Sequence, residues 1–150
     1  MRTIHFRARG VTLLELLTVI VIIGILAAIS VPTYRNYLLR AQRSDATTSL
    51  LRLASAQEKH MLQYGVYVTD TASVPNTPQT GGLGLSTTTE HGFYAIEVAA
   101  TATGYTATAT PLVGTGQHED TECAILTVNE SGTKGATNTA GTDSTAKCFR

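Results

Sequence analysis

Charge is scarce in this 150-residue chain, and one long stretch almost lacks it. Only 15% of the residues are charged, tryptophan is missing and aromatic residues make up 6%, while 43% are apolar. This length and apolar content are compatible with one folded domain plus a helical extension, and they argue against a multidomain enzyme.

The chain also lacks a surplus of positive charge. Eleven Lys and Arg balance eleven Asp and Glu, and residues 1–10 hold three of the bases, Arg2, Arg7 and Arg9. Without those ten residues, eight bases face eleven acids and the net charge is −3. A general nucleic-acid binder usually carries a basic surplus on one face, so the composition favours protein or membrane partners.

Cysteine is equally rare. Cys123 and Cys148 are separated by 24 residues, and neither has a His or a second Cys at the spacing of a zinc site. One disulfide is the simplest interpretation, and it favours a periplasmic or extracellular location because disulfides persist in oxidising compartments. Two unpaired buried thiols are the alternative, which the polar surroundings of Cys148 disfavour.

The stretch that almost lacks charge runs from residue 13 to residue 32, where Glu15 is the single charged residue among twenty. A helix of this length spans ~30 Å, the thickness of the hydrocarbon core of a bilayer. The stretch is therefore predicted to be a retained transmembrane helix. Cleavage as a secretory signal at Ala28-Ile29-Ser30 is the alternative and would discard the span.

Glu15 is a functional candidate on physical grounds. A charged side chain costs ~2.5–3.5 kcal/mol at the centre of a bilayer and less near the interface, so it is rarely kept there without a purpose. The alternative is a side chain that only snorkels to the interface.

The helix is predicted to continue beyond Pro32, with a kink near residues 28–32. Gly24 is a second position at which the helix can bend. Residues at helical spacing predict a packed face in its second half: Leu50, Leu53, Ala54, Gln57, Met61 and Tyr64. Polar positions between them are supplied by Arg35, Arg40, Arg43, Asp45, Arg52 and Glu58. Gly65 is a natural stop, so one helix is predicted from about residue 11 to about residue 64.

The rest of the chain predicts a connection followed by a small sheet. Residues 65–92 are rich in Thr, Ser, Gly and Pro and are expected to form a long surface connection. Strands are predicted at residues 93–98, 105–110, 123–128 and 133–136, and loop at 137–147. The expected fold is α+β, with a small antiparallel sheet covering the second half of the helix.

The segment Gly10-Val-Thr-Leu-Leu-Glu15, the apolar run at 21–29 and Pro32 strongly resemble the N-terminus of type IV pilins. The resemblance implies that a prepilin peptidase cuts between Gly10 and Val11 and methylates the new amino terminus of Val11. It also implies that Glu15 pairs with the amino terminus of a neighbouring subunit, which offsets the desolvation of both charges in the filament core.

The resemblance extends, less specifically, to the rest of the chain, which looks most like the PilE-type minor pilins. It implies the pilin fold, with Cys123 and Cys148 closing a C-terminal loop and with Gly24 and Pro32 allowing the helix to melt locally in the filament. Exposed residues 137–146 are then a candidate contact surface, with a solvated tail as the alternative. The implied domains are a leader at 1–10, a transmembrane and filament-core helix at 11–32 and a periplasmic head at 33–150.

The expected function is a structural subunit of a type IV pilus, a minor pilin that takes part in assembly of a filament for twitching motility, adhesion or DNA uptake. The alternatives are a DNA-binding receptor pilin, a major pilin and a type II secretion pseudopilin. Expected partners are other pilins through the N-terminal helix, the prepilin peptidase and the inner-membrane assembly platform. The expected location is the inner membrane, with a periplasmic head, and then the extracellular filament.

Two charged clusters near the C-terminus are weaker candidates. Lys134, Lys147 and Arg150 could contact DNA, but an ordinary solvated surface is favoured because no aromatic residue is interleaved with them. The acidic residues Glu119, Asp120 and Glu122 lack the ligand spacing of a known calcium loop, so a solvated acidic turn is favoured there.

No catalytic pattern is evident in the sequence. The histidines have no Ser, Cys or carboxylate constellation around them, and no phosphate-binding Gly motif is present: His5, His60, His91 and His118. We therefore expect neither enzymatic activity nor a cofactor or metal.

Overall fold

The computed structural model describes residues 11–69 and 82–149, and the chain divides after Tyr37 into two compact units. The first unit holds the beginning of helix α1, Leu13–Tyr64, and the second holds the remainder of α1 and all the strands. A boundary at residue 32 between a membrane segment and a head stays a prediction.

Helix α1 begins and ends at local capping signals. The Oγ1 of Thr12 accepts a hydrogen bond from the backbone N–H of Glu15 at 3.1 Å, as an N-cap residue does. At the other end, Gly65 has a φ of +74° and donates its N–H to the carbonyl of Met61 at 2.8 Å. The single long helix is confirmed, and it continues through Pro32.

The buried face of α1 in the second unit differs in part from the predicted one. Leu50, Leu53 and Gln57 are buried as expected, but at the end of the helix His60 is buried while Met61 and Tyr64 are only half-buried. The reason lies in the chain that follows the helix. The ring of His60 places Nδ1 2.8 Å from the carbonyl oxygen of Val66, so the returning backbone covers this side of α1.

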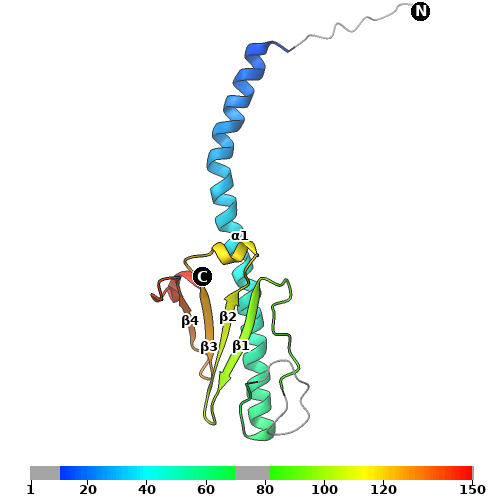
Figure 1. The fold of residues 1–150 in the computed structure, drawn as a ribbon, viewed down its shortest axis with the longest axis vertical. Helices are drawn as coiled ribbons and strands as arrows, with labels where there is room; N and C mark the ends of the chain where they lie inside the picture. The colour runs from blue at the N-terminus through cyan, green and yellow to red at the C-terminus, as the bar shows by residue number, and fades with distance from the viewer. Residues whose placement is uncertain (1–10, 70–81, 150) are drawn as a thin grey trace, which may run out of the picture. The chain divides into compact units, whose positions relative to one another are not determined.

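Four antiparallel strands form one sheet in the order β1-β2-β3-β4 (Figure 1). Their bounds are β1 Tyr94–Ala100, β2 Tyr105–Pro111, β3 Ile125–Asn129 and β4 Lys134–Thr137. In β2 the residues alternate between buried and more exposed positions, because successive side chains of a strand point to opposite faces. The predicted α+β fold and its four strands are confirmed, with ends shifted by one or two residues.

Two short helical turns were not predicted. The 3-10 helix η1, Gly116–Glu119, follows β2, and helix α2, Thr145–Cys148, lies partly inside the segment expected to be loop. Asp143 lies two residues before α2 and stabilises its first residue, because its Oδ1 accepts hydrogen bonds from the backbone N–H of Thr145 at 3.0 Å and from the Thr145 hydroxyl at 2.6 Å. Four residues are too few for helical periodicity to be recognised in the sequence.

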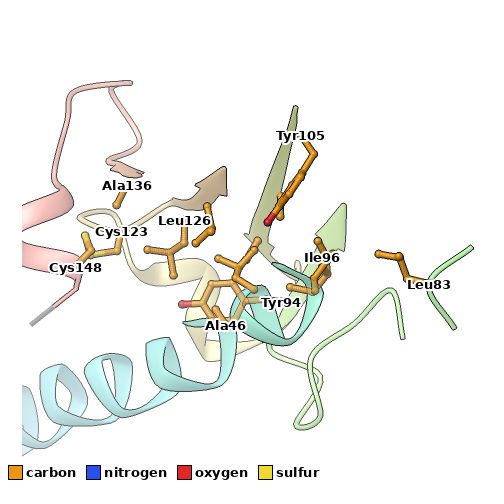
Figure 2. Packing of buried hydrophobic residues seen from close by; sticks show 14 of the residues in the cluster. Ala46, Leu83, Tyr94, Ile96, Tyr105, Cys123, Leu126, Ala136 and Cys148 are labelled. Carbon is orange, nitrogen blue, oxygen red and sulfur yellow. A yellow bond between two sulfur atoms is a disulfide. The ribbon is translucent and has the colours of Figure 1, made fainter. Parts of the chain in front are cut away.

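One core joins the sheet to α1 within the second unit, as Figure 2 shows for Ala46, Tyr94, Ile96 and Leu126. The predicted surface connection also contributes to it. Val68 and Leu83 are buried, and Gln57 exchanges hydrogen bonds with the backbone of Val68 at 2.5 and 3.1 Å. The described ends of residues 65–92 therefore belong to the core, while residues 70–81 lie outside the described part.

Candidate functional site

The first unit presents an apolar surface that no described residue of the chain covers. Every residue from Val11 to Leu38 is exposed, including Leu13 at 84% and Ile29 at 66%. An 18-residue window of α1 has a mean hydropathy of 2.7, and the helix is long and apolar enough to cross a membrane. Apolar surface of this extent is normally covered by lipid or by another protein.

Glu15 lies in the first turn of α1 and is exposed. Its backbone is held on both sides, by the Oγ1 of Thr12 on its N–H and by the Thr18 hydroxyl, which donates to its carbonyl at 2.9 Å. A carboxylate at this end of a helix is stabilised by the helix dipole. Val11 lies just before the helix and Gly10 lies outside the described residues, so cleavage, methylation and pairing of Glu15 stay predictions.

Gly24 and Pro32 both lie within the helical part of the first unit. A Cβ atom added to Gly24 would meet no atom of the described residues within 4 Å, so no steric contact within that part of the chain requires glycine there. The Thr33 hydroxyl donates to the carbonyl of Ile29 at 3.0 Å, one turn back and close to the bond that Pro32 cannot make. The kink and the local melting of the helix remain predictions.

The two cysteines form the predicted disulfide. Cys123 and Cys148 are bonded, their Cα atoms are 5.8 Å apart, and both are buried. The bond fixes α2 and the C-terminal segment to the chain just before β3, as Figure 2 shows.

A buried ion pair lies beside this disulfide and was missed in the sequence. Arg43 of α1 donates two hydrogen bonds to the carboxylate of Asp120, at 2.6 and 2.9 Å. Asp120 also accepts from the side-chain amide of Gln117 at 2.9 Å and from the backbone N–H of Cys123 at 3.2 Å. Asp120 therefore joins α1, η1 and the disulfide.

The position of Arg43 on the helix could have indicated this buried ion pair from the sequence. It lies three residues before Ala46 and seven before Leu50, on the face that packs against the sheet. An arginine in an apolar stripe indicates a buried partner, because a buried charge without one is costly.

The interpretation of residues 119–122 as a solvated acidic turn was wrong for Asp120, whose residue exposure is 3%. Its carboxylate is occupied by Arg43, and Glu122 forms an ion pair with Lys147. In the part of the chain that the structure describes, no group of three or more His, Cys, Asp or Glu residues could hold a metal ion.

The ring of Tyr94 lies in this buried region. Burial raises the pKa of its hydroxyl above the ordinary value, and the negative charge of Asp120 raises it further. Tyr94 is therefore neutral at physiological pH and acts as a packing residue.

The C-terminal bases have an aromatic neighbour, contrary to the expectation from sequence. The ammonium group of Lys134 lies 5.5 Å from the centroid of the Phe149 ring, within the range of a cation–π interaction. Lys147 is partly neutralised by Glu122, and Arg150 lies outside the described residues. The structure thus places Lys134 and Phe149 together, next to the disulfide.

The described histidines have separate surroundings. His60 is buried against Val66, whereas the exposed ring of His91 places Nδ1 3.1 Å from a carboxylate oxygen of Asp45. His118 is exposed in η1, and His5 lies outside the described residues.

Two family models match the chain. The first, described as type IV minor pilin ComP, DNA uptake sequence receptor, covers residues 32–127, more than half of the chain. The second, the prokaryotic N-terminal methylation motif, covers residues 5–31. The methylation motif and the exposed apolar helix together indicate membrane anchoring before assembly into a pilus.

Similar proteins are pilins. The chain is 42% identical over 65 residues to the type IV major pilin protein PilE of Neisseria gonorrhoeae, covering 43% of this chain and 39% of that protein. It is 37% identical over 75 residues to the type IV major pilin protein PilA of Myxococcus xanthus, covering 50% of this chain and 34% of that protein. These matches thus span little more than a third of each relative.

Among solved structures, the non-core minor pilin PilV of Neisseria meningitidis matches with a TM-score of 0.51 and 22% identity, over 71% of this chain and 93% of that chain. This match supports the pilin fold alone. Because the two relatives above are major pilins, the minor-pilin assignment rests on the family model for residues 32–127. The chain belongs to the family of the type IV minor pilin ComP, DNA uptake sequence receptor.

Proposed function

We propose that this protein is a minor structural subunit of a type IV pilus and has no catalytic role. The observation that carries the proposal is the methylation motif at residues 5–31 followed directly by the minor-pilin family match at residues 32–127. A prepilin peptidase cuts after Gly10 and methylates Val11. The head is then periplasmic until the subunit enters the extracellular filament, in agreement with its disulfide.

The exposed apolar surface of α1 is used both in the membrane, before assembly, and in the assembled filament. In the inner membrane it contacts lipid, and in the filament it contacts the same helices of neighbouring pilins. Exchange of lipid for other apolar helices carries no hydrophobic penalty, so an assembly platform can extract the helix. Glu15 pairs with the methylated amino terminus of a neighbouring subunit and sets the position of each helix.

The test is the substitution Glu15→Gln in a piliated cell that lacks the wild-type copy. The variant should reach the membrane and lose its leader normally, but its amount in sheared filaments should fall to a small fraction of wild type. Glu97→Gln, at an exposed position of β1, is the matched control and should be incorporated normally. Normal incorporation of Glu15→Gln would overturn the assembly role.

A second candidate function is DNA contact during uptake. The family description names a DNA uptake sequence receptor, and Lys134 beside Phe149 supplies a cation next to an aromatic ring. Lys147 and Arg150 add positive charge on the same C-terminal segment.

Fluorescence anisotropy with a labelled duplex tests this candidate, with the full-length protein in non-ionic detergent micelles. Wild type should bind, and the triple variant Lys134→Ala/Lys147→Ala/Arg150→Ala should bind more weakly. Lys59→Ala removes an exposed base elsewhere on α1 and should have little effect. Absence of wild-type binding would exclude DNA contact by the isolated subunit and leave the filament role in place.

A further inference from the structure

Strand β1 lies at one edge of the sheet and pairs with β2 on its inner side (Figure 1). Alternate residues of a strand direct their backbone N–H and C=O groups to opposite sides. The N–H of Leu112 donates to the Phe93 carbonyl at 2.9 Å, and the N–H of Thr101 donates to the Gly104 carbonyl at 2.7 Å. Both bonds follow the register of β1 and β2, so the odd-numbered residues of β1 bond to β2 and the even-numbered ones face outward.

The first half of this outward edge is already paired. The N–H of Ile96 donates to the Thr87 carbonyl at 2.7 Å, and the Tyr94 carbonyl accepts a hydrogen bond from the N–H of Thr89 at 3.0 Å. These two bonds form an isolated bridge between β1 and the segment that precedes it. Residues 87–89 therefore cover only the beginning of the edge.

The second half of the edge is open in the described part of the chain. No described residue bonds to the outward backbone groups of Val98 or Ala100, or to the carbonyl of Ile96. A strand edge with free donors and acceptors is a template on which another extended chain can pair. The backbone pattern of β1 thus specifies an extended peptide as the ligand that fits here.

A groove of about 450 Å³ lies beside this edge. Residues 95–98 of β1 line it, together with three exposed threonines from the chain before β1: Thr69, Thr87 and Thr88. Neighbouring strands in a sheet lie about 4.8 Å apart, so an added strand needs open space next to β1. The groove provides that space where the edge is unpaired.

The length of the open edge indicates which kind of chain can occupy it. The edge spans only residues 96–100, between the segment at 87–89 and the turn that follows β1. A second copy does not fit well, because antiparallel pairing of two β1 strands brings residues 87–89 of each copy against the turn of the other. A free terminus or loop of another protein meets no such obstacle.

The side chains beside the edge define the chemistry of this partner. Ile96 is buried, and Val98 and Ala100 are half-buried and pack against the core. A partner residue next to Val98 would place its side chain on the same face of the sheet, where an apolar group is favoured. Its neighbours would point to the opposite face, so the partner segment should alternate apolar and polar residues.

We propose that the outer edge of β1 at residues 96–100 binds an extended segment of another protein, which adds to the sheet as a fifth strand. The main chain of this segment bonds to Val98 and Ala100, and its apolar side chains extend the core beside them. The interaction is separate from filament assembly through α1 and from DNA contact by the C-terminal bases. It gives the head a docking surface for a protein partner.

The probe is a fluorescent synthetic peptide in which valine and threonine alternate, with a lysine at each end for solubility. Fluorescence anisotropy measures its binding to the full-length protein in non-ionic detergent, and empty micelles provide the blank. Methylation of backbone nitrogens removes N–H donors from alternate residues of the peptide. Methylation of the set that faces β1 should abolish binding, and methylation of the other set should leave it unchanged.

Two proline variants test the same contact from the protein side. Val98→Pro removes the outward N–H of this residue and leaves the bonds to β2 in place, and proline is tolerated at such positions of edge strands. It should weaken binding roughly two- to tenfold, and Ala100→Pro should act likewise. Val98→Thr is the matched control, since it keeps the N–H and a branched side chain and should bind nearly as well as wild type. Urea unfolding shows whether each variant stays folded.

The outcomes discriminate as follows. Failure of wild type to bind the peptide at ~1 mM would overturn the proposal. Equal effects of the two methylated sets would overturn it as well, because only strand pairing distinguishes alternate nitrogens. A folded Val98→Pro that binds as tightly as wild type would also contradict it. Should the proline variants not fold, the methylated peptides with wild type still decide. Self-association of wild type that Val98→Pro removes, without peptide binding, would show that a second copy covers the edge and that the proposed partner is wrong.

Discussion

Arg43 and Asp120 are 77 positions apart in the sequence and are joined by two hydrogen bonds, at 2.6 and 2.9 Å, with both side chains buried. Each of the two residues also contacts a second part of the head. Arg43 belongs to the face of α1 that packs on the sheet, and Asp120 accepts the N–H of Cys123. The pair therefore fixes the disulfide-closed segment against the helix.

Removal of one member of this pair should destabilise the head strongly. Asp120→Ala leaves the Arg43 guanidinium buried without a counter-charge, and we expect the free energy of unfolding to fall by about 3–5 kcal/mol. Urea unfolding of the full-length protein in non-ionic detergent, followed by near-UV circular dichroism, measures the change.

Two further variants test whether the buried charge is the cause. Arg43→Met combined with Asp120→Leu removes both charges and should recover much of the lost stability. Arg52→Ala breaks the exposed pair of Arg52 with Glu90, at 3.6 Å, and should cost less than about 1 kcal/mol. Equal losses from Asp120→Ala and Arg52→Ala would contradict the role given to the buried pair.

The disulfide should contribute measurably to the stability of the head. Cys123→Ser combined with Cys148→Ser removes a crosslink with a sequence separation of 25, and we expect a loss of about 3.5 kcal/mol from the entropy of the unfolded chain. Urea unfolding provides the measurement. A reducing agent should destabilise wild type and leave the double variant unchanged, and an effect on the double variant would point to another cause.

Alkaline pH should destabilise the second unit through Tyr105. Burial raises the pKa of its hydroxyl to about 12, and the negative charge of Glu58 adds to the effect. Because the pKa is near 10 in the unfolded chain, the contribution of neutral Tyr105 to stability is complete below pH 10 and is lost as the pH rises from 10 to 12. Thermal unfolding measured across this range should show the melting temperature falling.

Tyr105→Phe provides the comparison for this pH profile. It removes the ionisable hydroxyl, so its melting temperature should fall less between pH 10 and 12 than that of wild type. Tyr34→Phe, at an exposed position in the first unit, should follow wild type. A Tyr105→Phe profile as steep as that of wild type would assign the alkaline loss to other groups.

A methyl group should not fit at Gly135. A Cβ atom there would lie 2.7 Å from the Thr127 hydroxyl oxygen on the neighbouring strand, so Gly135→Ala should lower stability by about 1–3 kcal/mol through overpacking. Gly116→Ala is the matched control, since its Cβ atom would meet nothing within 4 Å. Thermal unfolding of both variants tests the contrast, and similar melting temperatures would show that β3 and β4 adjust at no cost.

Much of the architecture could be predicted because it depends on neighbours in the chain. Helical spacing and Gly65 predicted the long helix, and alternation predicted the strands. The methylation motif and the apolar stretch beside it likewise lie in one continuous segment, so the candidate processing residue Val11 and the candidate assembly residue Glu15 could be named from the sequence.

The surroundings of the candidate DNA-contact site could be predicted only in part. Lys134 was singled out, but its contact with Phe149 depends on how β4 packs beside the C-terminal segment. In the same way, His60 is buried in place of Met61 because the chain returns past Val66.

By itself, the sequence determined the apolar N-terminal segment, the helix, the strands and the simplest cysteine pairing, because charge depletion, periodicity and turn residues act over a few neighbouring positions. Only the tertiary structure decided that Arg43 is buried against Asp120 and that Lys134 lies over the ring of Phe149. An ion pair or a groove between distant residues depends on the packing of whole elements, and a side chain's type does not specify which distant partner that packing will bring to it.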